Sequence, residues 1–247
     1  MMGVTIHRGR LILDHHMTTF YKLVLAALLS LILIAPVHAL AGTKRDKRKV
    51  AQPTRAELKQ AQARLSEMGY GAGRNALVAF QKYERRPATG RFSRADVEAI
   101  LNARAPQPRD SGYRHVEIDL DRQVLLLISD NGAVQKVLPV STGSNRQYRE
   151  KTMSGLAYTP RGRFRVYSKL KGWRKSPLGL LYYPNYFSDG IAIHGNPSVP
   201  NTPQSHGCIR IPMSEAVAMS RELPLGSIVL VYDSQSFVSA KDWAERQ

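Results

Sequence analysis

The chain contains one cysteine, Cys208, in the segment Ser205-His206-Gly207-Cys208-Ile209-Arg210, and His194-Gly195 lies upstream of it. A single thiol cannot form an intramolecular disulfide, and these polar and flexible neighbours differ from the apolar surroundings of a structural cysteine. A thiol becomes an effective nucleophile when a nearby base takes its proton. We therefore interpret Cys208 as a candidate nucleophile.

Two histidines could serve as that base. His194 ends an apolar, strand-like run, where a rigid element can project the imidazole into a cleft. His206 lies two residues before Cys208, and in an extended segment the two side chains point to the same face. Arg210 shares that face and could bind a substrate carboxylate through two hydrogen bonds or form a structural ion pair. The residues alone leave both histidines open as the base.

The neighbours of Cys208 suggest how a reaction intermediate would be stabilised. Gly207 allows the backbone to approach a reacting carbonyl, with the amides of Cys208 and Gly207 as candidate donors to an oxyanion. Ser205 is expected to form local hydrogen bonds. The alternative is a zinc site built from His194, His206 and Cys208 with an open fourth position. No HExxH motif and no nearby carboxylate supply the usual base for such a site, so we predict no metal.

Together these residues resemble the signature of the L,D-transpeptidase catalytic domain family. The lead-in segments 159–164, 176–179 and 190–195 extend the resemblance over residues 113–233. It implies a mostly β domain, sandwich- or barrel-like, that needs no cofactor. It also implies that His194 is the base and that the carbonyl of Gly195 orients it. His206, Ser205 and Arg210 are then left to shape the site or bind substrate.

The resemblance further implies a substrate, the tetrapeptide stem of peptidoglycan. Cys208 would form an acyl-enzyme with release of D-alanine, and an amine of a second stem would accept the acyl group. Water as acceptor would make the protein an L,D-carboxypeptidase, and a protein amine would make it a protein-to-wall ligase. Carbapenems acylate the family's thiol. The alternative of another class is a non-catalytic wall-binding protein.

Residues 1–41 have the features of a secretory signal peptide. Lys22 precedes the apolar run from Leu23 to Ala35, and Val37-His38-Ala39 offers a cleavage site of small residues. Met17 is a plausible true start, because the segment that it begins carries all of these features. We therefore expect export to the periplasm or the cell-wall face of a bacterial envelope. An uncleaved segment would instead tether the protein to the membrane.

The composition is strongly basic, with 36 Lys and Arg against 19 Asp and Glu and a net charge of +17. Such a charge favours anionic partners, which for an exported protein include the cell-wall surface. The sequence contains no basic helix interleaved with aromatic residues and no known nucleic-acid module, so we expect no nucleic-acid partner. Diffuse charge supports retention at an anionic wall without identifying a substrate.

A polar basic linker, residues 42–53, is followed by a predicted helical domain over residues 54–104. Thr54 and Glu57 form a capping-box pattern, a second helix is expected over 75–83, and Ser93 is expected to cap a third. This part resembles a peptidoglycan-binding domain of the three-helix type in four short segments, 62–65, 68–70, 79–81 and 89–90. The alternative is that the helices are only a spacer.

A proline-containing linker, residues 105–112, separates the helices from the predicted catalytic domain at 113–233, and residues 234–247 form a tail. Beyond the linker the pattern becomes strand-like. Strands are expected over 116–120, 124–128, 134–140, 164–167, 191–193 and 228–232, with one helix over 214–222. Many short strands with few helices indicate a sandwich or a closed barrel.

Overall fold

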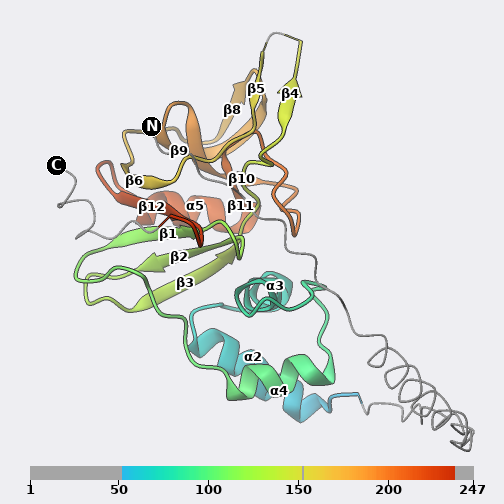
Figure 1. Ribbon diagram of the computed structural model, residues 1–247. Helices are drawn as coiled ribbons and strands as arrows, with labels where there is room; N and C mark the ends of the chain where they lie inside the picture. Colours follow the sequence, from blue (N-terminus) through green and yellow to red (C-terminus); the bar gives the residue numbers. More distant parts are fainter. Residues whose placement is uncertain (1–51, 152, 237–247) are drawn as a thin grey trace, which may run out of the picture. The chain divides into compact units, whose positions relative to one another are not determined.

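The computed structural model describes residues 52–151 and 153–236 (Figure 1). The predicted signal peptide, nearly all of the basic linker and most of the C-terminal tail lie outside these residues. Within them, three helices come first and the strands follow, with one further helix between the last two strands. None of the helices in this part of the chain has the length and apolar character needed to span a bilayer.

The three helices are α2 (Arg55–Glu67), α3 (Gly73–Tyr83) and α4 (Arg94–Asn102). The predicted cap of α2 is confirmed, since the Glu57 amide donates to Thr54 Oγ1 and the Thr54 amide donates to Glu57 Oε2. Ser93 caps α4 in the same way through Asp96. These reciprocal bonds satisfy amides that a helix start leaves unpaired.

The first sheet has the strand order β3-β2-β1-β12-β6. Its strands are β1 (His115–Asp119), β2 (Val124–Ile128), β3 (Val134–Pro139), β6 (Gly162–Arg165) and β12 (Ile228–Tyr232). The pairing of β1 with β12 is parallel and the other pairings are antiparallel.

The second sheet has the order β11-β10-β9-β7, and β8 pairs with β9. Its strands are β7 (Ser168–Lys169), β8 (Trp173–Ser176), β9 (Gly179–Ser188), β10 (Ile191–Asn196) and β11 (Ile209–Pro212). A separate hairpin joins β4 (Gln147–Arg149) and β5 (Ser154–Leu156), and helix α5 (Met213–Glu222) follows β11 directly. This architecture confirms the predicted mostly β domain preceded by a small helical bundle.

Two hydrophobic cores meet at the first sheet. One core combines Leu125 and Leu127 of β2 with residues of β10, β11 and helix α5. The other combines Leu126 of β2 with residues of all three N-terminal helices. Because successive side chains of a strand point to opposite faces, β2 contributes to both cores. This explains why its sequence is apolar throughout instead of alternating.

The segment 105–112 is fastened to the first sheet by the buried carboxylate of Glu117. The amides of Arg109 and Asp110 donate to this carboxylate at 2.8 and 2.9 Å, and Tyr232 Oη donates at 3.1 Å. Glu117 lies on β1 and is fully buried. Since a buried carboxylate is stable only when it is hydrogen-bonded, these contacts fix the path of the proline-containing segment.

Candidate active site

The parallel pairing of β10 and β11 brings the two motif segments together. His194 of β10 lies opposite Arg210 of β11, and Ile193 lies opposite Ile209. Cys208 immediately precedes β11, so it lies at the start of the strand that neighbours the histidine strand. Buried isoleucines anchor both strands in the core, which gives the polar residues rigid supports.

Cys208 is partly buried, and its sulfur lies against the backbone that leads into β10. The Ala192 amide donates to Cys208 Sγ at 3.4 Å, and the sulfur is 3.8 Å from the Gly190 carbonyl oxygen. Burial raises the pKa of the thiol, while the Ala192 amide and the charge of Arg210 act in the opposite direction. Because burial is the largest cause, the protonated thiol is favoured at neutral pH.

His194 is buried, with 4% of its surface exposed. Its Nδ1 lies 2.9 Å from the carbonyl oxygen of Gly195, which can only accept a hydrogen bond. We therefore assign the proton to Nδ1, which leaves the lone pair of Nε2 available. Burial lowers the pKa of the imidazole to about 4, with a smaller contribution from Arg210 and opposed by the Gly195 hydrogen bond. The ring is neutral near pH 7.

Two glycines of the motif are required by close packing. A Cβ at Gly195 would lie 2.6 Å from Cβ of Ala216, so helix α5 packs directly on this backbone. Gly207 has a φ of +144°, and a Cβ there would lie 2.8 Å from the Tyr158 carbonyl oxygen. Larger side chains would displace the segments that carry His194 and Cys208.

Ser205 closes the turn before the thiol with local hydrogen bonds, as the sequence predicts. Its hydroxyl donates to the Cys208 carbonyl at 2.6 Å and accepts from the Gly207 amide at 3.0 Å. Thr159 adds a support from a distant segment, since its hydroxyl donates to the Gly207 carbonyl at 2.7 Å and accepts from the Gly143 amide. The turn is therefore fixed from both sides.

His206 contacts the β4–β5 hairpin. Its ring packs edge-on against Tyr148, with centroids 4.7 Å apart, and its Nε2 lies 3.6 Å from a carboxylate oxygen of Glu150. His194, in contrast, is directed by the backbone of its own strand. The two histidines, which the residues alone could not rank, thus have different surroundings.

A cleft of about 600 Å³ contains Cys208, His194, Ser205, His206 and Arg210. Arg210 forms no ion pair with an acidic residue in the described part of the chain, which leaves its charge available inside the cleft. The sequence did not identify the walls, which come from the β4–β5 hairpin and the segment after it, from strands β8 and β9, and from Asp189. The lining residues from these parts include Tyr148, Met153, Leu156, Tyr158, Arg174, Lys175, Tyr186 and Asp189.

A metal site would require His194, His206 and Cys208 to converge with their ligand atoms. Over residues 52–151 and 153–236, no group of three or more His, Cys, Asp or Glu side chains is placed to hold a metal ion. The His206 ring instead contacts Tyr148 and Glu150.

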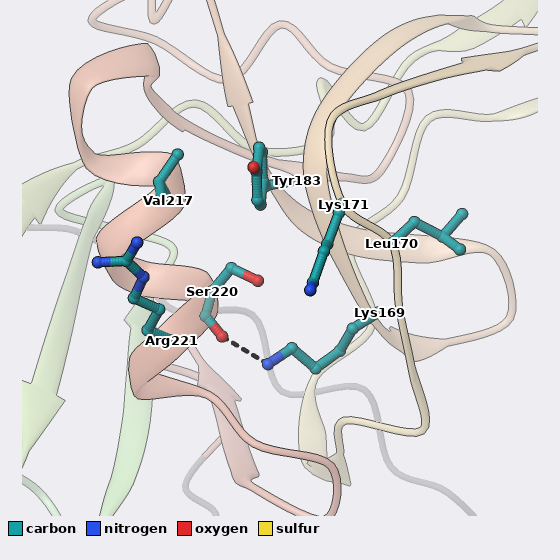
Figure 2. A pocket seen from close by; sticks show the side chains of 7 residues that line it. All are labelled: Lys169, Leu170, Lys171, Tyr183, Val217, Ser220 and Arg221. Atoms are coloured by element: carbon teal, nitrogen blue, oxygen red, sulfur yellow. Dashed lines mark hydrogen bonds between the residues drawn. The ribbon is translucent and has the colours of Figure 1, made fainter.

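A second cavity of about 420 Å³ lies between the β7–β8 region and helix α5 (Figure 2). It is basic, and Lys169 Nζ donates to the Ser220 carbonyl oxygen near the end of α5, where a cation stabilises the helix dipole. The lining residues include no thiol, imidazole or carboxylate. They are Lys169, Leu170, Lys171, Tyr183, Val217, Ser220 and Arg221.

Comparisons with known proteins agree with this geometry. The family model for the L,D-transpeptidase catalytic domain (YkuD) matches residues 113–231. A crystal structure of an L,D-transpeptidase from Xylanimonas cellulosilytica is 35% identical, with a TM-score of 0.66, and the match covers 74% of this chain and 95% of that one. The chain belongs to the L,D-transpeptidase family.

This L,D-transpeptidase is also similar to an L,D-transpeptidase from Stackebrandtia nassauensis, at 19% identity and a TM-score of 0.46, over 74% of this chain and 93% of that one. None of the curated proteins compared with it matches. The match to the Xylanimonas protein covers more of this chain than the catalytic-domain match does. The family acts on peptidoglycan stem peptides, which makes the cleft around Cys208 the region to interpret chemically.

Proposed function

We propose that this L,D-transpeptidase uses Cys208 to form an acyl-enzyme from a peptidoglycan tetrapeptide stem. The thiol would attack the carbonyl of the third, diamino-acid residue, release D-alanine and transfer the acyl group to an acceptor amine. One observation carries the proposal: Cys208 opens into the cleft beside the strand whose His194 has an unused Nε2 lone pair. The product would be a remodelled or cross-linked wall.

The protonation states favour general-base catalysis over a preformed ion pair. Burial favours the neutral thiol of Cys208 and the neutral imidazole of His194. As the sulfur attacks the carbonyl carbon, its proton passes to Nε2 of His194. The same proton then goes to the departing amine of D-alanine, and a thioester remains. An acceptor amine attacks the thioester and gives its proton to His194; the carbon–sulfur bond breaks, and His194 returns that proton to the departing sulfur, which restores the thiol and the neutral imidazole.

The oxyanion of the tetrahedral intermediate needs hydrogen-bond donors. We assign this role to the Cys208 amide, because the Gly207 amide already donates to Ser205 Oγ. One such donor contributes roughly 3 kcal/mol to transition-state stabilisation. Gly207 then serves the site by its conformation, and Arg210 is proposed to bind a substrate carboxylate through two hydrogen bonds.

Acylation by a carbapenem, measured by intact mass, tests the nucleophile. We expect one covalent adduct on the wild type and none on Cys208→Ser, which should also lose D-alanine release. His194→Ala should slow acylation by roughly 10²- to 10⁴-fold and His206→Ala far less. An unmodified wild type would refute the acylation step, and a larger loss for His206→Ala would reverse the two histidine roles.

Incubation of the protein with wall fragments, followed by mass spectrometry, distinguishes the acceptors. A 3→3 cross-link identifies a stem amine, a shortened stem identifies water and hence an L,D-carboxypeptidase, and a linked protein identifies a protein-to-wall ligase. A wall-binding protein without activity would bind the fragments and leave them unchanged. Insensitivity of product formation to a strong chelator would exclude the zinc alternative.

Retention at the wall is proposed as a second property. The net charge of +17 favours an anionic cell-wall surface, and export to the periplasm or wall face would bring the protein to it. Sedimentation with insoluble peptidoglycan at low and high salt tests this proposal, since exposed charges are screened over about 8–10 Å at ordinary ionic strength. Binding that persists at high salt would support the peptidoglycan-binding resemblance of the helices.

A further inference from the structure

Lys82 is a buried lysine that donates hydrogen bonds to backbone oxygens. It lies on α3 with 5% of its surface exposed, and its Nζ donates to the Val140 carbonyl at 2.7 Å and to the Pro200 carbonyl at 3.2 Å. It forms no ion pair with an acidic residue in the described part of the chain. Burial lowers the pKa of this ammonium group to about 8. A buried cation without a carboxylate partner is costly, so its role needs an explanation.

One of the two acceptors belongs to the loop that connects the candidate base to the candidate nucleophile. Pro200 lies between His194 on β10 and Cys208 before β11. The next residue, Asn201, donates from Nδ2 to the Ala88 carbonyl at 2.6 Å, in the connection between α3 and α4. The helical part of the chain therefore binds this loop through two consecutive residues.

The other acceptor belongs to a segment that contacts the nucleophile's own turn. Directly after Val140, the Ser141 amide donates to the Arg210 carbonyl at 3.1 Å, and Ser141 Oγ donates to a carbonyl of the 197–204 loop at 2.8 Å. The Thr142 carbonyl accepts from the Ser205 amide at 2.9 Å. Lys82 thus lies where the strand β3 exit and the 197–204 loop meet.

We propose that Lys82 is a positioning residue for Cys208, holding the 197–204 loop against the exit of β3 and so fixing the nucleophile relative to His194. An ammonium group suits this task because its three N–H donors can bind carbonyls of two segments at once. The inference rests on the proposed function of Cys208. It gives the N-terminal helices a role in the catalytic domain that is independent of any binding to the wall.

The test compares Lys82→Met, which keeps an unbranched side chain but removes the donors, with Lys59→Met. Lys59 lies on helix α2 and is exposed, so its replacement controls for the loss of one positive charge. Lys82→Arg retains charge and donors and should restore part of the lost rate. Each variant is made in the full chain, and its thermal unfolding is recorded first.

The first readout is acylation by a carbapenem. We expect Lys82→Met to lower the maximal acylation rate constant by roughly 10- to 100-fold, because small displacements of reacting groups are costly. The half-saturating drug concentration should change little, since the cleft walls come from other segments. A merely structural residue would instead lower activity only in proportion to the unfolded fraction.

The second readout does not depend on transpeptidase activity. Cys208 is the only cysteine, so alkylation of the chain by iodoacetamide across pH reports its thiol alone. We expect the alkylation midpoint to shift in Lys82→Met but not in Lys59→Met, because displacement of the turn changes both the burial of the sulfur and its contact with the Ala192 amide, the two largest influences on the thiol pKa. If the wild type is not acylated, this arm still tests the positioning role.

If Lys82→Met has the same acylation rate and the same alkylation midpoint as Lys59→Met, the proposal is overturned. If Lys82→Met does not fold, Asn201→Ala replaces it, because Asn201 is exposed and its side chain supplies the neighbouring link to the helices. We then expect a several-fold slower acylation at unchanged thermal stability. An unchanged acylation rate in a folded Asn201→Ala would equally overturn the proposal.

Discussion

The two faces of the first sheet differ in what covers them. On one face, Leu125 and Leu127 pack in a core shared with the second sheet and helix α5, from which the cleft residues project. On the other face, Leu126 packs against the three N-terminal helices. The candidate catalytic groups Cys208 and His194 lie beyond the first face, yet the second face is also buried. The comparison teaches that the helices complete the core of the catalytic domain, although a proline-containing segment separates them in the sequence.

Removal of the helices is expected to have the largest effect on the stability of the fold, because it leaves the second face of the sheet uncovered. A fragment that starts at Ser111 would expose the apolar residues of β2 and β3 that now face the helices, and we expect it to aggregate or to unfold without cooperativity. A fragment that starts at Gln52 is the control, and it should unfold in one transition. Gel filtration and near-ultraviolet circular dichroism measure both. A monomeric, cooperative Ser111 fragment would show that the two parts are separable.

Substitution of adjacent leucines of β2 allows the contributions of the two faces to stability to be compared directly. Leu125→Ala creates a cavity on the cleft side and Leu126→Ala creates one on the helix side, and each should lower the free energy of unfolding by about 2–5 kcal/mol. Denaturant titration should show one transition for both variants. Two separate transitions for Leu126→Ala would mean that the helices unfold independently of the sheets.

Each face also buries a base with a lowered pKa, which predicts one pH-dependent limb of stability in the acid range and one in the alkaline range, both rising with pH. Between about pH 6.5 and 4 the unfolded chain protonates His194 before the folded chain does, so stability falls as pH falls, by up to about 3 kcal/mol. Between about pH 8 and 10.5 the folded chain loses the Lys82 proton first, so stability rises with pH. Unfolding measured across pH should lose the acid limb in His194→Gln and the alkaline limb in Lys82→Met. Unchanged limbs in the variants would contradict this attribution.

Loss of the helix cap at Thr54 is expected to have the smallest effect on stability, and it tests whether the helices and the sheets unfold together. Thr54→Ala removes the side-chain acceptor for the Glu57 amide and should cost about 1 kcal/mol. If the helices and the sheets form one cooperative unit, the midpoint of global unfolding falls and the acylation rate stays the same. A cap variant that alters only the local hydrogen exchange of α2 would indicate independent fraying.

Local patterns predicted much of the fold. Residues close together in the sequence were enough to predict four elements: the caps at Thr54 and Ser93 and the apolar strands β2 and β12. Strand β9, the longest, was not predicted, because it contains Pro184 and Asn185, residue types that favour turns. Residues typical of turns thus concealed a strand that only tertiary pairing stabilises.

The candidate site also has a part that was predicted from short motifs and a part that was not. The thiol, its two histidines and Arg210 were predicted because they share short motifs, and the structure brings His194, Cys208 and Arg210 together in one cleft. The cleft walls were not predicted, since nothing in the sequence near Arg174 indicates that its segment will lie beside the strand that carries His194. Lys82 was missed for the same reason, because a lysine on a helix ordinarily lies in solvent.

The burial of Cys208 bears on how long the enzyme stays chemically intact. Peroxides and disulfides react with thiolates, and the surroundings of this sulfur favour the protonated form. In the proposed mechanism the thiol stays neutral until His194 takes its proton during attack, so we expect it to be slow to form sulfenic acid or a mixed disulfide. The sequence contains no second cysteine to resolve such a product, so we expect resistance to oxidation to come from the resting state of the buried, neutral thiol.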